Sequence, residues 1–217
     1  MKAIVFDIET TGLPKIKDPP IEESRWWPYI VQISWLVFDT KTKRIEKVRD
    51  FIIKLPSHIF IPPSATKIHG IDRTISNEKG ITIKKALKHF TKDLMRSHFI
   101  IAHNIKFDKS IISVEYHRNN FIDWIGRYRG TKICTMKMGN TLCDIKYIHP
   151  VTGNRVSKYP KLVELHQHLF NSIPKNLHNS LIDVYVCFRC FYKLIYDEDY
   201  CKKNSRFSRK FSSLSSL

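Results

Sequence analysis

Two carboxylates stand two residues apart near the start of the chain. Asp7 and Glu9 close a short apolar run, residues 3–7, whose pattern predicts a strand. Residues two apart on a strand point to the same side, so these carboxylates would repel each other unless a cation lay between them. A divalent cation with oxygen ligands is the usual partner of such a pair. For an isolated pair, two solvated acids before a turn would be the commoner explanation.

Three further residues could join that pair. Asp108 follows a predicted strand over residues 99–102 and opens a helix, and Asp183 lies in the first turns of the last long helix. His178 comes five residues before Asp183. Alone, each has an ordinary explanation as a helix-dipole acid or a cap-region histidine. Because strand ends and helix starts gather along one edge of an α/β sheet, their joint occurrence favours a single site.

Such a set of side chains has a known chemistry. Four acids around two divalent ions roughly 4 Å apart form the usual apparatus of phosphodiester cleavage. One ion lowers the pKa of a bound water, and the other stabilises the leaving 3′-oxygen. An imidazole such as that of His178 can accept the proton of the water.

The charge of the chain points to an anionic partner. The 217 residues carry 37 basic and 20 acidic side chains, a formal net charge of +17, and 42% of them are hydrophobic. This length suggests one domain, and this composition excludes global disorder. Nucleic acid is the usual partner of so basic a folded chain, with an anionic membrane surface as the alternative.

The same composition bears on location. No apolar run approaches the ~18 residues of a membrane span, and the longest, residues 29–38, is interrupted by Gln32 and Ser34. The first residues lack the pattern of a secretory signal, and the five scattered cysteines predict reduced thiols. We therefore expect a protein of the cytoplasm, the nucleus or a viral replication compartment, neither secreted nor membrane-bound.

The elements that must position the site follow from hydrophobic periodicity. The order βββαβαβαα predicts a mixed sheet flanked by helices, an α/β fold. Loops are expected over residues 14–28 and 137–160, and a basic, serine-rich, disordered tail over 201–217 beyond a domain of residues 1–200. The predicted strands are 3–7, 29–38, 44–55, 99–102 and 131–135, and the predicted helices are 83–94, 107–119, 162–169 and 181–191.

Three sequence motifs resemble those of the DEDDh 3′→5′ exonucleases, the family that includes the proofreading epsilon subunit of bacterial DNA polymerase III. They are FDIETTGL at 6–13, AHNIKFD at 102–108 and HNSLID at 178–183. ATKIHGI at 65–71, ICTM at 133–136 and KYPKLVELHQHLF at 158–170 agree with the same family, so the resemblance runs from about residue 1 to 195. It implies a ribonuclease H-like three-layer fold with a central mixed five-stranded sheet.

The resemblance also implies roles for the five clustered residues. Asp7 would bridge two Mg²⁺ ions, for which Mn²⁺ could substitute. Glu9 and Asp183 would hold the ion on the nucleophile side, and Asp108 would reach the other ion through water. His178 would be the general base. The implied substrate contacts are Thr10, Thr11, Gly12, Leu13, His69, His103 and Asn104.

The chain departs from the family pattern at two motif positions and in one loop. Ser180 stands where alanine is common, and Ile182 where an additional acid is frequent. Trp26 and Trp27 belong to a longer segment than compact members have. They could form a stacking surface for a base or a packed aromatic clamp over the sheet edge, which we favour.

We therefore expect a 3′→5′ exonuclease that releases nucleoside 5′-monophosphates from single-stranded or frayed DNA. An oligoribonuclease-like exoribonuclease is the alternative, and a non-catalytic module that accompanies a separate DNA polymerase is a third. Proofreading, repair and degradation are not separated by the sequence, nor are monomer and homodimer. The lysines of 84–92 form either a surface that follows a nucleic-acid backbone or a solvated helix face, and the basic tail could add affinity for phosphates.

Overall fold

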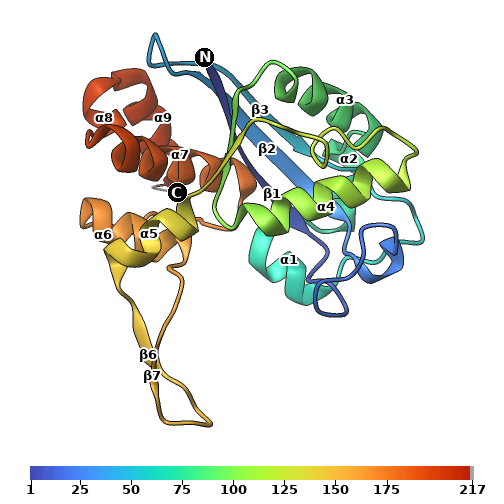
Figure 1. Cartoon of the computed structure of the whole chain (residues 1–217). Coiled ribbons are helices and arrows are strands. Elements are labelled where there is room, and N and C mark those ends of the chain that lie inside the picture. Colours follow the sequence, from blue (N-terminus) through green and yellow to red (C-terminus); the bar gives the residue numbers. More distant parts are fainter. Residues whose placement is uncertain (216–217) are drawn as a thin grey trace.

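The computed structural model describes residues 1–215 and is built on one five-stranded sheet. The strands lie in the order β3-β2-β1-β4-β5 (Figure 1). β1 pairs antiparallel with β2, and β2 with β3, whereas β4 runs parallel to both β1 and β5. This arrangement confirms the predicted mixed sheet. The bounds are β1 Lys2–Thr10, β2 Ile30–Asp39, β3 Arg44–Ile52, β4 Phe99–Ala102 and β5 Thr131–Cys134.

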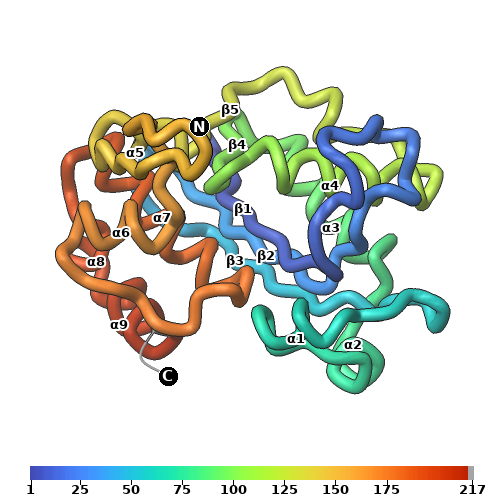
Figure 2. The backbone as a smooth tube through the Cα atoms, turned by 90° about the horizontal axis from the view of Figure 1, so that it is seen from below, coloured from blue at the N-terminus to red at the C-terminus, as the bar shows by residue number. Residues whose placement is uncertain are grey.

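Helices lie on both sides of the sheet, so the fold has three layers (Figure 2). One side carries α1 (Pro63–His69), α2 (Arg73–Lys79), α3 (Ile83–Leu94) and α4 (Ile105–Arg118). The other carries α5 (Thr135–Cys143), α6 (Leu162–Phe170), α7 (Ser180–Tyr196), α8 (Tyr200–Lys203) and α9 (Ser205–Ser215). A 3-10 turn, η1 (Ser24–Trp26), interrupts the segment between β1 and β2.

The alternation along β1 decides which layer receives the acids. Ile4, Phe6 and Ile8 are buried in the core that contains α3 and α4. Ala3 and Val5 are buried in the opposite core, which contains α7. Because side chains alternate across a strand, the carboxylates at positions 7 and 9 continue the row of Ala3 and Val5. They therefore lie on the α7 side of the sheet, at its end.

The segment 137–160 is not the loop that we expected. α5 extends to Cys143, and β6 (Lys146–Ile148) pairs antiparallel with β7 (Arg155–Ser157). The hairpin projects from the body of the molecule beyond α5 and α6 (Figure 1). Its strands contact little besides each other, so the period-2 burial signal that identifies a strand in a sequence is missing.

The prediction of a disordered tail is wrong for the described part of 201–217, because α8 and α9 fold back onto α7. Phe207 and Phe211 are buried, and the Phe207 ring lies 5.0 Å from that of Tyr200 and 5.5 Å from that of Phe188. Although the segment is rich in serine, Phe207 and Phe211 lie four positions apart and form the apolar stripe of a helix. The packed unit thus continues beyond residue 200, and positions 216–217 lie outside the described residues.

No helix within residues 1–215 combines the length and the hydropathy that a bilayer crossing requires.

Candidate active site

The four acids identified in the sequence meet at the end of β1. Asp7 and Glu9 come from β1, Asp108 from the first turn of α4, and Asp183 from the first turn of α7. One ligand atom from each of Glu9, His178 and Asp183 lies within 4.8 Å of the others. The fold therefore joins carboxylates that are up to 176 residues apart in the sequence, the interval from Asp7 to Asp183.

Burial raises the pKa of all four carboxyls, and repulsion between the carboxylates adds to this effect for Asp7, Glu9 and Asp108. Burial, followed by the charges of Asp183 and Asp108, raises the pKa of Glu9 to about 8. Burial raises the pKa of Asp7 well above its usual range, and the carboxylates of Asp108, Asp183 and Glu9 add to this effect. Burial likewise raises the pKa of Asp108 and of Asp183. Perturbation of several neighbouring acids in one cleft is typical of a functional site.

His178 and Asp183 are joined through the backbone. The N–H of His178 donates a hydrogen bond of 3.0 Å to Oδ2 of Asp183. His178 adopts a left-handed conformation with φ of 73°, which is uncommon for a residue other than glycine. Its side chain is exposed. The segment before α7 thus presents an accessible imidazole beside a buried carboxylate.

The carboxylate cluster fits a divalent cation. Oδ1 of Asp183 is buried and has no hydrogen-bond partner, although its neighbour Oδ2 has one. A buried oxygen of this kind costs free energy unless something positive satisfies it. Carboxylate oxygens are ligands that suit Mg²⁺ and Mn²⁺. The donor set is therefore suitable for a metal centre.

A buried polar network fixes the start of α7. Oγ of Ser180 lies 2.6 Å from Oγ of Ser34 on β2, and the Ser180 N–H donates to Oε1 of Gln32 at 3.2 Å. Ser34 and Gln32 in turn donate to Oδ1 of Asp50 on β3, at 2.7 and 2.8 Å. The side-chain amide of Gln32 also approaches Asn179, the N-cap of α7, at 3.4 Å.

The sequence did not lead us to predict this network, although two polar residues within an apolar strand indicated a buried polar contact. Gln32 and Ser34 are the only polar residues in the apolar stretch of β2 before Asp39. Both are buried, and a buried polar residue on a strand needs a partner. The partner is the loop-helix junction that carries the third motif. Ser180, which stands where the family commonly has alanine, belongs to the same network, because its hydroxyl contacts that of Ser34.

The turn after β1 contains the residues expected to meet the substrate end, of which Leu13 is exposed. The Thr10 hydroxyl donates to the Gly12 carbonyl at 2.6 Å, and the Thr11 hydroxyl accepts from the Tyr29 N–H at 3.0 Å. Gly12 has φ of 143°, a value that favours glycine. Leu13 is 77% exposed. The two hydroxyls are thus engaged within the protein, and an apolar side chain is left free at the edge of the site.

The two histidines expected near the substrate are held within the protein. Nδ1 of His103 lies 3.0 Å from the Thr135 hydroxyl, and Nε2 lies 3.0 Å from the Pro160 carbonyl. His69 is buried, and its Nδ1 accepts from the Ile71 N–H at 3.0 Å. Burial lowers the pKa of His103 to about 4 and that of His69 in the same direction. His103 thus joins the end of β4 to the first residue of α5 and to the segment before α6.

Asn104 differs from these histidines. It is exposed and takes a left-handed conformation at the N-cap of α4, with φ of 68°. Its side chain makes no capping hydrogen bond, so its amide is available beside the helix that carries Asp108.

The segment of 14–28 packs against α4. Arg118 donates to the carbonyls of Ser24, Trp27 and Pro28 at 2.6–2.7 Å and pairs with Glu115 at 2.7 Å. The Trp27 ring is buried, and its N–H donates to the Pro20 carbonyl at 2.9 Å. For Trp27, this burial supports the predicted packed aromatic clamp rather than a stacking surface for a base.

The comparison with protein families decides the classification. A family model described as an exonuclease (RNase_T) matches residues 4–191, a range that includes all five clustered residues. This chain belongs to the DEDDh-type exonuclease family. A comparison with curated proteins gives no match.

Solved structures of exonuclease I share the fold of this family member. E. coli exonuclease I in complex with a dT13 oligonucleotide matches with a TM-score of 0.68 and 15% identity, over 96% of this chain and 45% of that one. The zinc-bound E. coli ExoI–ssDNA complex matches at 0.66 and 16%, over 90% and 41%. Exonuclease I from Methylocaldum szegediense matches at 0.65 and 16%, over 96% and 44%.

This likeness establishes the ribonuclease H-like fold of the DEDDh exonuclease. The chain spans less than half the length of exonuclease I.

Proposed function

We propose that this exonuclease is a metal-dependent 3′→5′ enzyme that hydrolyses single-stranded or frayed DNA and releases nucleoside 5′-monophosphates. The observation that carries the proposal is the meeting of Asp7, Glu9, Asp108 and Asp183 beside the exposed imidazole of His178. The 3′→5′ direction follows from the resemblance of the three motifs. DNA is favoured because the related fold of exonuclease I is known with DNA oligonucleotides.

The four carboxylates would hold the divalent ions. When bound, such ions polarise the scissile phosphate and neutralise the negative charge that develops on it. The chain itself supplies the pre-arranged, partly buried oxygens, whose raised pKa values express how strongly they favour a positive partner.

His178 is the proposed general base. Its ring is exposed, so an attacking water can reach a ring nitrogen and transfer a proton to it. The backbone bond to Asp183 ties the position of the imidazole to the carboxylate cluster. Ser180 and Gln32 hold the next turn, which restricts the movement of the base.

The turn after β1 would receive the 3′ end. Since the hydroxyls of Thr10 and Thr11 are engaged, we assign the contact with the terminal 3′-hydroxyl to the backbone of this turn. The exposed Leu13 would pack against the last base. Asn104 has a free amide beside the site. His103 is assigned a positioning role because both of its ring nitrogens already contact the protein, and His69 because its ring is buried and bonded through Nδ1.

The test follows 5′-labelled DNA and matched RNA strands with Mg²⁺, Mn²⁺ or EDTA. Progressive shortening of DNA with release of mononucleotides, dependent on the metal, is expected. Asp183→Asn should abolish release and keep the fold. Asp197→Asn is the matched control, because Asp197 lies at the other end of α7 and is exposed.

Two outcomes would contradict the proposal. Full activity of Asp183→Asn would remove the metal-binding role of this carboxylate. Faster degradation of RNA than of DNA would replace DNA as the substrate and favour the exoribonuclease alternative.

A further inference from the structure

A groove lies between the edge strand β3 and helix α9, apart from the carboxylate cluster. Its volume is about 780 Å³. We call it the β3–α9 groove. Its charged lining residues are Arg44, Glu46 and Lys47 from β3 and Arg206, Arg209 and Lys210 from α9.

The charges of this groove are not balanced within the protein. Glu46, the one acid that lines it, is paired with Lys2 at 2.6 Å, and Lys47 is paired with Asp93. Within the part of the chain that the structure describes, the remaining four cations form no ion pair. Like charges that face each other across a groove are unfavourable without a counter-charge. The groove therefore offers four unpaired cations to an external anion.

Helix α9 arranges its cations in one row. Arg206, Arg209 and Lys210 are separated by three and four positions, so they share one face of the helix. Phe207 and Phe211 are buried on another face and fix this helix to α7. The row rises about 6 Å from Arg206 to Lys210, and its three long side chains extend from the helix toward the groove. It can therefore contact two or three consecutive phosphates.

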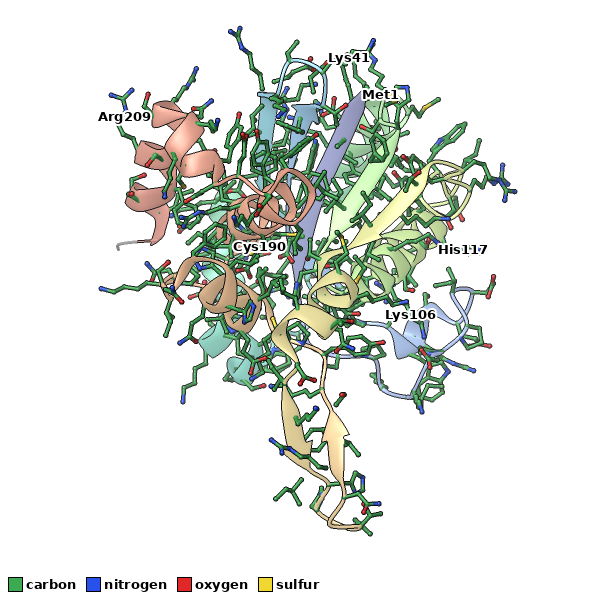
Figure 3. All side chains as sticks on the ribbon, turned by 60° about the vertical axis from the view of Figure 1, so that its left-hand side comes forward. Met1, Lys41, Lys106, His117, Cys190 and Arg209 are labelled. Atoms are coloured by element: carbon green, nitrogen blue, oxygen red, sulfur yellow. The ribbon has the colours of Figure 1, made fainter. Side chains whose placement is uncertain are left out.

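The groove extends along the sheet from Tyr185, two residues after Asp183 on α7, to Arg44, and its Arg44 end lies far from the active site. Asp7 is opposite Ser34, which is opposite Asp50 on β3. Arg44 is six residues from Asp50, a separation of about 20 Å on a strand. Figure 3 shows Arg209 at the end of the molecule that carries Met1 and Lys41, opposite the projecting hairpin. A strand bound at both places must therefore span several nucleotides.

We propose that the β3–α9 groove binds the phosphate backbone of the substrate strand at a distance from its 3′ end. The proposal rests on the proposed function for the nature of the strand. The groove supplies affinity without base recognition, because its charged lining offers cations and no unpaired acid. It would retain a long strand between successive cleavages and leave a very short one unaffected.

The test compares two triple variants with equal loss of charge. Arg206→Gln/Arg209→Gln/Lys210→Gln removes the α9 row, and Lys84→Gln/Lys85→Gln/Lys88→Gln removes three exposed cations from α3. Binding of fluorescent dT13, an oligonucleotide already known with exonuclease I, is measured in EDTA over a salt series. The α9 variant should bind about tenfold more weakly and lower the salt slope by about 1.4 to 2, which is ~0.7 for each phosphate contact.

Cleavage separates this inference from the proposed function. With metal, the α9 variant should lose about the same factor in kcat/KM on dT13 and none on a dinucleotide, whose single internucleotide phosphate must lie at the carboxylate cluster. If the wild-type protein cleaves nothing, the proposed function fails, and the binding comparison still decides the groove. Arg44→Gln tests the β3 side of the groove independently of α9 folding, and weaker dT13 binding is expected.

Four results would overturn the inference. Equal losses in the α3 and α9 variants would assign binding to overall charge or to the α3 lysines as well, and would not single out the groove. Unchanged binding by the α9 and Arg44 variants would exclude the groove. An equal loss on the dinucleotide would indicate an indirect effect on the active site. Binding of polyglutamate of matched charge as tight as that of dT13 would replace nucleic acid with an acidic protein as the occupant.

Discussion

The hydroxyl oxygens of Ser180 and Ser34 lie 2.6 Å apart, and neither side chain is exposed to solvent. One residue opens the helix of the third motif, and the other faces Asp7 across the β1–β2 pair. The bond therefore joins the helix that carries Asp183 to the strand that lies beside Asp7 and Glu9. Both side chains are fully buried and in direct contact, so a larger side chain at either position would have no space.

Two substitutions at position 180 should separate loss of this bond from loss of space. Ser180→Ala removes one hydrogen bond and should cost about 1 kcal/mol, with activity nearly retained because alanine fits. Ser180→Val adds volume to a filled site and leaves polar groups unpartnered, and should cost about 2–4 kcal/mol and most of the activity. Urea unfolding and initial rates measure both effects. Equal unfolding free energies and rates for the two variants would show that the protein around position 180 can make room for valine.

The raised pKa of Glu9 predicts how stability depends on pH without metal. The folded state favours the protonated acid, so its contribution to stability is complete below about pH 4.5 and is lost as the pH rises toward about 8. A divalent cation binds the deprotonated site, so the rise in Tm on adding Mn²⁺ to EDTA-treated protein should be larger at pH 8 than at pH 6. Glu9→Gln should flatten both dependences, whereas the exposed control Glu22→Gln should not. A metal-induced shift of Tm that did not depend on pH would contradict this account.

The buried pair of Arg118 and Glu115 should be important for stability. Arg118→Ala leaves the Glu115 carboxylate buried without its partner and frees three carbonyls of the segment 14–28. A cost of about 3–5 kcal/mol is expected. Adding Glu115→Gln to this variant should restore part of the loss, since no buried charge remains. A cost below about 1 kcal/mol in urea unfolding would indicate that the segment is held by other contacts.

Helix α9 should behave as part of the core. Phe207→Ala empties a site among Tyr185, Phe188 and Tyr200, so it should lower the free energy of unfolding by about 3–5 kcal/mol. Arg209→Ala, on the exposed face of the same helix, should change it by less than about 0.5 kcal/mol. Equal small effects would mean that α9 is detached in solution.

The half-buried ring of His103 should contribute to acid sensitivity. Its pKa is lowered from 6.5 to about 4, chiefly by burial, so the folded protein holds the neutral ring. The resulting stability is complete above about pH 6.5 and is lost as the pH falls through about 4. His103→Asn should reduce the slope of Tm in this interval, and the exposed control His117→Gln should leave it unchanged. An unaltered slope in the His103 variant would show that other groups, such as His166, dominate.

Regular periodicity made much of the fold predictable from local sequence. Helix 83–94 and strand 99–102 have the predicted bounds, because their apolar positions repeat with one clear period and caps or turns border them. The hairpin of β6 and β7 and the helix α9 were not predicted. Neither is recognisable from composition, since the hairpin has no buried face and α9 is held by only a few aromatic residues in a polar segment.

The sequence by itself determined which residues could do the chemistry, because carboxylates at strand and helix ends and one histidine before a helix are readable from spacing alone. Only the tertiary structure decided that Gln32, Ser34 and Asp50 support the third motif, that the His103 ring is held by protein partners, and that Arg44 and α9 enclose a groove. These relationships join residues that lie tens to more than a hundred positions apart. Their energies depend on burial and distance, which the chain acquires only when β2, β3 and α7 pack together.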